Sequence, residues 1–169
     1  MFNRTQKNCF LASVSAGALA LALSAAPASA AGSASSQFNV TANVQPTCLI
    51  SAGDLPFGNY AGSAVSQSST ISVTCTNTTA YNVALDPGEA PSATVTTRQM
   101  VGTAGATLNY KLTTDSAHQA NWGQTVGTDT VTGSGNGNAQ TLTVYGLLAS
   151  GQYVAPGAYS DIITATISY

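Results

Sequence analysis

Hydrophobic and polar residues alternate in short segments along much of this chain of 169 residues. A period of two is the spacing of a β-strand with one buried face. Turn-forming clusters such as Asp86-Pro87-Gly88 separate the segments, and no helical stripe interrupts them. The pattern predicts an all-β chain folded as an antiparallel β-sandwich. The alternating apolar positions are Ile71, Val73 and Cys75; Tyr81, Val83 and Leu85; Leu108, Tyr110 and Leu112; Leu142 and Val144; Ile163, Ala165, Ile167 and Tyr169.

One further alternating segment, with Phe38, Val40, Ala42 and Val44 on one face, lies in a Ser/Ala-rich leader. Strand spacing does not decide whether this segment joins the sheet of its own domain or that of another molecule. The final alternating segment runs to Tyr169, the last residue of the sequence. We therefore expect a sandwich that lacks its last edge strand and exposes a hydrophobic groove open to β-augmentation.

The first thirty residues have the three parts of a secretory signal. Arg4 and Lys7 are followed by an apolar run from Cys9 to Leu23 and by Ala28-Ser29-Ala30, a small-x-small cleavage pattern. The run is shorter than the roughly 20 apolar residues of a spanning helix. We predict cleavage after Ala30 and no membrane span in the mature chain.

Charge is scarce: 4 Lys+Arg and 6 Asp+Glu make 6% of the residues, against about 25% in ordinary domains. Two of the four cations belong to the predicted signal, so the mature chain keeps Arg98 and Lys111 and has a net charge of 2 − 6 = −4. Nucleic-acid binding and polybasic membrane binding both need clustered cations, and we expect neither.

Two cysteines remain after the signal, Cys48 and Cys75. An even pair in an exported protein favours a disulfide. Its loop of about 28 residues corresponds to roughly 3.5 kcal/mol in the chain-entropy model. Metal binding is the weaker alternative, because the single His118 and the two cysteines form no known ligand pattern.

The sequence offers little support for catalysis. His118 is the single histidine and no GxSxG motif occurs. Asp86 and Glu89 resemble the carboxylate pair of a glycosidase, but turn residues at a strand end explain them better. Trp122 is the residue that could stack against a sugar. The stretch 133–138 looks like a flexible loop or hairpin tip and lacks the features of a phosphate-binding loop. We expect no enzyme activity and no cofactor.

An ordered set of motifs covers nearly all of the mature chain. These stretches are Leu55-Pro56-Phe57-Gly58, residues 71–75, 81–88 and 108–112, Asn121-Trp122-Gly123, residues 144–148 and residues 156–169. Through this set, and through the closing stretch 156–169 above all, the chain resembles the spore coat protein U-like domain, which is also the pilin domain of archaic (Csu-type) chaperone–usher pili.

The resemblance implies an incomplete immunoglobulin-like β-sandwich of the pilin type that lacks its seventh strand. A periplasmic chaperone would lend a strand to the groove, and at the outer-membrane usher the N-terminal extension of the next subunit would replace it. Cys48 and Cys75 match the family's disulfide between the first two strands. The implied organisation is a signal peptide at 1–30, a donor-strand extension at 31–46 and a pilin domain at 47–169.

The donor segment implied by the resemblance is residues 33–45, with Phe38, Val40, Ala42 and Val44 inserting. The expected residues of the acceptor groove and chaperone-facing C-terminal strand are Ile163, Ala165, Ile167 and Tyr169. The implied function is that of a structural subunit of a secreted surface fibre, with a role in adhesion or biofilm formation. Its partners would be chaperone, usher and other pilin subunits. The alternatives are a spore- or cell-surface coat protein of the same fold and a self-contained carbohydrate-binding sandwich.

Overall fold

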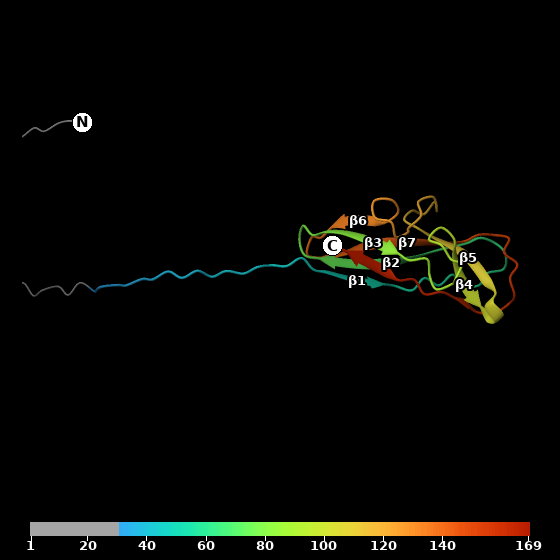
Figure 1. The fold of residues 1–169 in the computed structure, drawn as a ribbon, viewed down its shortest axis with the longest axis horizontal. Helices are drawn as coiled ribbons and strands as arrows, with labels where there is room; N and C mark the ends of the chain where they lie inside the picture. The colour runs from blue at the N-terminus through green and yellow to red at the C-terminus, as the bar shows by residue number, and fades with distance from the viewer. Residues whose placement is uncertain (1–30) are drawn as a thin grey trace, which may run out of the picture. The chain divides into compact units, whose positions relative to one another are not determined.

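Two antiparallel sheets form the compact unit Ala42–Tyr169 (Figure 1). They are seen in a computed structural model that describes residues 31–169, so the predicted signal peptide lies outside the described residues. Among those, residues 31–47 form no strand. The all-β prediction is confirmed.

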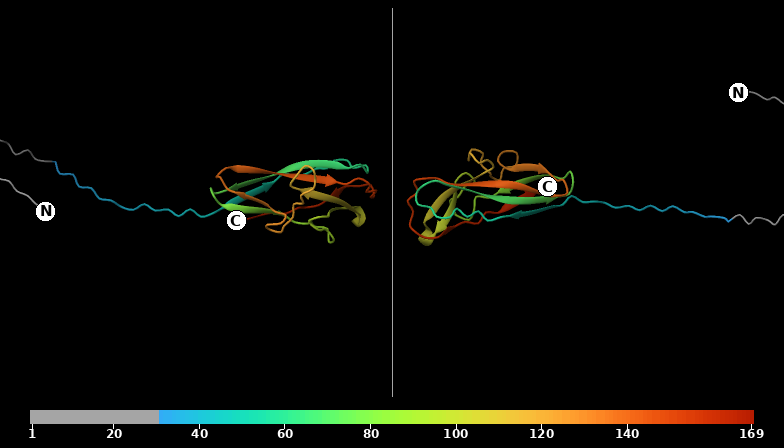
Figure 2. Two further views of the ribbon diagram at one scale, coloured as in Figure 1. Left: turned by 90° about the horizontal axis from the view of Figure 1, so that it is seen from above. Right: turned by 180° about the vertical axis from the view of Figure 1, so that it is seen from behind.

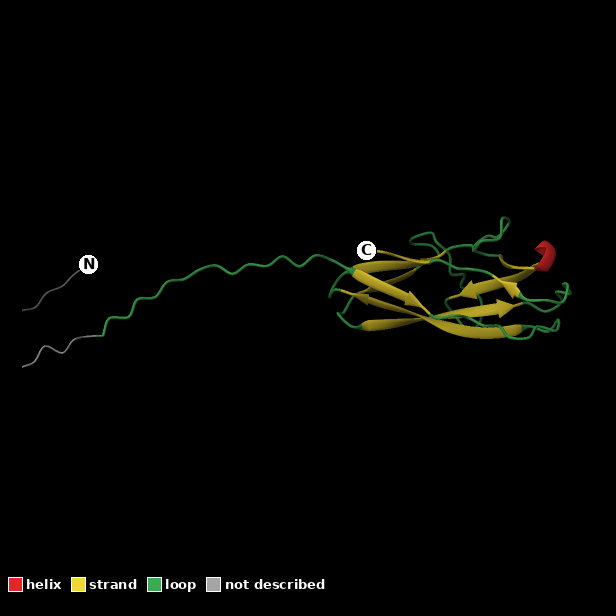
Figure 3. Cartoon of the chain, turned by 90° about the horizontal axis from the view of Figure 1, so that it is seen from below, coloured by secondary structure: helices red, strands yellow, loops and turns green. Residues whose placement is uncertain are grey.

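The larger sheet has six strands in the order β1-β2-β7-β5-β4-β8, and the smaller has three in the order β6-β3-β9. Figure 2 shows the same ribbon from two further sides. A short 3-10 turn, η1 (Thr103–Gly105), connects β4 to β5 and is drawn in red in Figure 3. The strands are β1 Cys48–Ala52, β2 Val65–Cys75, β3 Ala80–Leu85, β4 Arg98–Gly102, β5 Thr107–Thr113, β6 Val131–Ser134, β7 Ala139–Leu148, β8 Tyr159–Ser160 and β9 Ala165–Ser168.

The core lies between the inward faces of the two sheets. In β2, β3 and β5, buried residues alternate with exposed or half-buried ones, as the period of two predicts. Ile163, Ala165 and Ile167 are partly buried and pack against this core from the C-terminal segment. The buried residues of this core cluster are Cys48, Ile71, Val73, Cys75, Tyr81, Val83, Leu85, Leu108, Tyr110, Leu112, Trp122, Val144 and Leu148.

A disulfide joins Cys48 of β1 to Cys75 of β2, which are directly opposite in the antiparallel register. The predicted pairing between the first two strands is therefore confirmed. Within residues 31–169, β1 pairs with β2 alone, so the disulfide fixes the N-terminal end of a short edge strand to the sheet.

The glycine-rich stretch 133–138, which was predicted to be a flexible loop or a hairpin tip, begins in β6 and connects two strands that do not pair with each other. β6 pairs with β3 in the smaller sheet, whereas β7 pairs with β2 and β5 in the larger one, so the stretch carries the chain from one sheet to the other. A side chain at Gly135 would collide with the carbonyl of Thr76 and with Cys75. Glycine is therefore required by the close approach of this crossing to the disulfide.

Over residues 31–169, no helix is long and apolar enough to cross a membrane.

Candidate functional site: an open groove beside the C-terminal strand

One edge of β9 carries no partner strand within residues 31–169. On the other edge of the strand, Thr164, the residue before β9, forms two hydrogen bonds with Asp86. The Thr164 N–H donates to the Asp86 carboxylate at 3.0 Å, and the Thr164 carbonyl accepts from the Asp86 N–H at 3.2 Å. Successive residues of a strand direct their backbone groups to opposite sides. The backbone groups of Ile163, Ala165 and Ile167 therefore point toward the open edge.

The hydrogen bonds of β1 to β2 likewise show which backbone groups of β1 lie on its free edge. Thr76 N–H donates to the Thr47 carbonyl at 3.0 Å, and Gly53 N–H donates to the Thr70 carbonyl at 2.9 Å. With a period of two, the odd-numbered residues of β1 bond to β2, and the even-numbered ones, 48, 50 and 52, present their backbone groups to the other side. Some Cα atoms of β1 and β9 lie within 8 Å of each other, so these two strands lie close together.

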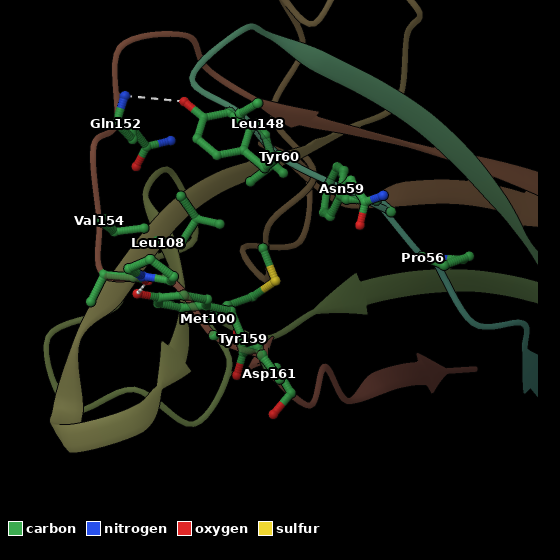
Figure 4. A pocket seen from close by; sticks show the side chains of 18 of the residues that line it. Pro56, Asn59, Tyr60, Met100, Leu108, Leu148, Gln152, Val154, Tyr159 and Asp161 are labelled. Carbon is green, nitrogen blue, oxygen red and sulfur yellow. Dashed lines mark hydrogen bonds between the residues drawn. The ribbon is translucent and has the colours of Figure 1, made fainter.

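The chain segments that follow β1 and precede β9 enclose two adjoining cavities, which together form the groove. The larger one, of about 880 Å³, lies between residues 54–62 and 152–161, above Met100, Leu108 and Leu148 (Figure 4). The smaller one, of about 360 Å³, lies between residues 52–57 and 161–165. Its floor consists of core side chains from both sheets, which are Ile71, Leu85, Met100, Tyr110, Leu112 and Val144.

Leu55 and Phe57 form part of the groove wall and pack directly on β7. A Cβ at Gly146 would lie 2.8 Å from Phe57 Cζ and 2.9 Å from Leu55 Cδ2. The Phe57 ring also meets the ring of Tyr110 edge to face, with the ring centres 5.9 Å apart. The absence of a side chain at Gly146 thus allows this wall to sit close to the sheet.

Beside the larger cavity, the loop after β7 is hydrogen-bonded to the segment at Tyr60 and to β5 at Asn109. Tyr60 Oη donates to the Ala149 carbonyl at 2.6 Å and accepts from Gln152 N–H at 3.0 Å (Figure 4). The Gln152 amide exchanges two hydrogen bonds with the backbone of Asn109, at 2.8 and 2.9 Å. These bonds tie the loop to both segments, and Tyr153 within it is 90% exposed.

Asp161 lines both cavities. Its carboxylate accepts hydrogen bonds from Tyr110 Oη at 2.6 Å, Glu89 N–H at 2.9 Å and Ile162 N–H at 2.9 Å. Burial and the hydrogen bond to Asp161 raise the pKa of the Tyr110 phenol well above its usual range. The carboxylate therefore links the C-terminal segment to β5 and to the connection after β3.

Arg98 is completely buried at the start of β4. Its guanidinium donates to four backbone carbonyls, those of Leu85, Asp86, Val95 and Trp122, at 2.7 to 3.0 Å. Burial lowers the pKa of Arg98, and the nearby Asp86 and Asp161 carboxylates oppose the shift. This single cation joins β3, β4 and the segment at Trp122 behind the groove.

The predicted donor residues lie outside the core. Phe38, Val40 and Val44 are 86%, 83% and 80% exposed, and Ala42 is exposed as well. Of the predicted acceptor residues, Ile163, Ala165 and Ile167 come together beside the groove. Tyr169 follows the last residue of β9 and is 59% exposed. Their assignment to donor and acceptor roles stays a prediction.

Other candidate residues have structural surroundings. Trp122 is 1% exposed and its indole N–H donates to the Val83 carbonyl at 2.9 Å, so the expectation that it could stack a sugar is wrong. His118 is half-buried and lies between the hydroxyls of Ser66, at 2.8 Å, and Thr113, at 3.2 Å. The Asp86 carboxylate accepts from backbone N–H groups, as a turn residue does.

Sequence reasoning missed two buried polar arrangements, the hydrogen bond of Tyr110 to Asp161 and the four carbonyls around Arg98. The available signals were weak: Arg98 is one of two cations after the predicted signal, and Asp161 follows Ser160 directly before Ile162 and the last alternating segment. Their hydrogen bonds join residues far apart in the chain, so no local pattern reveals them.

Free edges on two strands around an apolar groove define an incomplete, pilin-type sandwich. The model of the family described as "Spore Coat Protein U domain" matches residues 34–166. Protein U of Myxococcus xanthus is 32% identical over 179 residues, covering 96% of this chain and 99% of that protein. The chain belongs to the Spore Coat Protein U domain family.

A solved structure supports the fold. It is a chaperone–tip adhesion subunit pre-assembly complex from archaic chaperone–usher Csu pili of Acinetobacter baumannii, and the matched chain has a TM-score of 0.58 and 22% identity. The match covers 75% of this chain but only 40% of that one. At this identity the likeness establishes the fold.

Proposed function

We propose that this chain is a structural subunit of an exported chaperone–usher surface fibre. Subunits join by donor-strand complementation, in which residues 33–45 of one subunit fill the groove of another. A periplasmic chaperone occupies the groove before assembly, and an outer-membrane usher exchanges it for the next subunit's extension. Residues 31–46 are thus the donor extension, and residues 47–169 are the pilin domain.

The observation that carries this proposal is the match between the groove and the exposed segment. The groove has an apolar floor and free backbone groups on β1 and β9. The segment offers Phe38, Val40, Ala42 and Val44 at strand spacing, exposed to solvent. An inserted strand therefore meets both a hydrophobic floor and hydrogen-bonding edges, which is the chemistry of β-augmentation.

The magnitudes are sufficient for a long-lived joint. Burying Phe38, Val40 and Val44 contributes about 1.5–3 kcal/mol each, or roughly 5–9 kcal/mol before the ordering cost. Each ladder hydrogen bond adds about 1 kcal/mol net. Because release requires the whole strand to separate, the dissociation rate governs the lifetime of the fibre more than equilibrium affinity does.

Deletion of residues 33–45 tests the proposal. The truncated subunit should still bind its chaperone, because its groove is intact, but it should not add behind another subunit. Co-purification with the chaperone and the length of polymers in unboiled samples on SDS gels report the two properties separately. A deletion that unfolds the isolated domain, or a full-length protein that purifies without chaperone as a cooperatively melting monomer, would contradict the proposal.

A coat protein on a spore or cell surface is the second candidate function, favoured by the family description and by the relative named Protein U. It would use the same groove and the same joint. Immunogold labelling of secreting cells separates the two roles: thin fibres extending from the cell indicate a pilus, and a continuous layer indicates a coat.

A further inference from the structure

Asn136 is the single asparagine of the sequence that is followed by a glycine. Asn136 and Gly137 lie between β6 and β7, where the chain crosses from one sheet to the other, and both are exposed to solvent. Because glycine has no side chain, its backbone nitrogen approaches the preceding side chain with less obstruction than the nitrogen of any other residue. The carboxamide of Asn136 is therefore the one in this chain that is most open to attack by its own backbone.

The reaction available to such a pair is succinimide formation. The Gly137 backbone nitrogen gives its proton to solvent and bonds to the Asn136 Cγ, and the carboxamide nitrogen leaves as ammonia. Water then opens the ring at either of its carbonyl carbons. Opening at one carbon gives aspartate with an unchanged backbone. Opening at the other gives isoaspartate, in which the main chain runs through the former side chain and is longer by a methylene.

In the folded chain, hydrogen bonds hold both reacting groups. The Gly137 N–H donates to the Cys75 carbonyl at 3.1 Å, which engages the attacking nitrogen with β2. The Asn136 Oδ1 accepts from the Asn138 N–H at 2.9 Å, so the carboxamide is held in a local turn. Both bonds must open before the nitrogen can reach Cγ. The fold thus restrains a reaction that the sequence favours.

The backbone on either side of Asn136 has no room for an extra methylene. The Gly135 N–H donates to the Thr79 carbonyl at 2.8 Å, and the Gly135 carbonyl accepts from the Thr78 N–H at 2.9 Å. A Cβ at Gly135 would lie 2.7 Å from the Cβ of Cys75, so this residue cannot shift toward the disulfide. Position 136 is therefore spanned by two fixed points, and a longer backbone between them cannot keep the bonds of both.

We propose that Asn136 is a site of spontaneous conversion to isoaspartate, and that this modification separates chains that fold promptly from chains that do not. A chain that stays unfolded forms isoaspartate at this position and then cannot complete the crossing between the sheets. A chain that folds is protected by the two hydrogen bonds. The inference uses contacts within one domain and does not rest on the proposed function.

Peptide mapping by mass spectrometry tests the site and its protection. The full-length chain, with its disulfide intact, is kept in mildly alkaline buffer, either native or unfolded in guanidinium chloride. We expect the unfolded chain to convert first at Asn136, and the native chain to convert there at least about tenfold more slowly, because two hydrogen bonds must open together. Asn138, which is exposed in the same stretch but precedes alanine, is the internal control and should convert far less. Equal rates in the two states, or earlier conversion at another asparagine, would overturn the proposal.

Refolding separates the effect of the longer backbone from that of the new charge. After partial conversion, the unfolded chain is diluted into native buffer, and its folded and misfolded fractions are mapped separately. Isoaspartate at position 136 should be at least about tenfold enriched in the misfolded fraction. The aspartate product carries the same charge on an unchanged backbone and should be distributed equally. Enrichment of both products, or of neither, would overturn the role given to the backbone.

Asn136→Gln is the matched variant, because the extra methylene of its side chain disfavours closure of the ring. After the same incubation in denaturant, this variant should refold as well as a sample of the variant that was never incubated, whereas the wild type should lose refolding yield in step with its isoaspartate content. Equal losses in the variant and the wild type would show that another change in the chain limits refolding, and would overturn the proposal.

Discussion

At the scale of single residues, the buried cation carries more structure than its size suggests. Arg98 satisfies four backbone carbonyls, which belong to three segments of the chain, at Leu85–Asp86, Val95 and Trp122. The planar guanidinium offers five N–H donors in a fixed fork, whereas a lysine ammonium offers three on a longer flexible chain. A lysine at this position would leave buried carbonyls unpaired.

Arg98→Lys should therefore lower the free energy of unfolding by roughly 2–5 kcal/mol, measured by urea denaturation of samples in the same assembly state. Lys111→Met is the matched control, because Lys111 is exposed on β5 and should change the value by less than about 0.5 kcal/mol. Equal effects of the two substitutions would show that the carbonyl cluster does not depend on the guanidinium.

Tyr110 predicts an alkaline limit to stability. Its pKa in the folded chain lies above the ordinary value of 10.0, so the folded state keeps the phenol proton at a pH where the unfolded state has lost it. The free energy of unfolding should then fall as pH rises above about 10. Tyr110→Phe should reduce this dependence in pH-resolved urea titrations, at the cost of one hydrogen bond to Asp161. Tyr153→Phe, at a 90% exposed position, should leave it unchanged.

At the scale of elements, β1 is held by one neighbouring strand and one disulfide. Replacing Cys48 and Cys75 by alanine should lower the free energy of unfolding by about 3.5 kcal/mol on the chain-entropy account. Reduction of the wild type should give the same shift in the urea midpoint. Leu49→Ala is the control, because Leu49 follows Cys48 directly and is 71% exposed. This substitution should change the free energy of unfolding little. An unchanged midpoint after reduction would mean that β1 stays in place through hydrogen bonds and packing alone.

The strands that the sequence predicts are those whose alternation is long. β2, β3, β5, β7 and β9 each place apolar residues on one face, and burial follows that face. β4 was missed because it begins with a buried arginine, and β6 because it contains Gly133. β8 has two residues, too few for any period to appear.

The candidate site also has a part that the sequence predicts and a part that it does not. Alternation alone places Ile163, Ala165 and Ile167 on one face, and the structure packs that face against the core. The walls of the groove could not be foreseen, because Leu55 and Phe57 depend on the missing side chain of Gly146, 89 positions beyond Phe57 in the chain. Spacing within a strand is local, whereas the shape of the groove is set by contacts between distant segments.

At the scale of the whole molecule, the scarcity of charge bears on assembly. Residues 31–169 contain two cations and six acids, and Arg98 and Asp161 are occupied by hydrogen bonds within the domain. A joint made of apolar contacts and backbone hydrogen bonds should respond little to ionic screening. If the chain forms the proposed fibre, we expect the dissociation rate of its polymers to change by less than about twofold between low and molar NaCl, followed by gel analysis over time. Rapid release in high salt would indicate that ion pairs hold the subunits.

The C-terminal segment changes sheets partway along: β8 pairs with β4 in the larger sheet, and β9 pairs with β3 in the smaller one. A strand lying alongside this segment would run next to both layers. In the proposed fibre, a pulling force along the fibre axis would then load the joint in shear, so that its ladder bonds resist together and do not peel apart singly. The tensile strength of the proposed fibre would then depend on the point between β8 and β9 at which the C-terminal segment changes sheets.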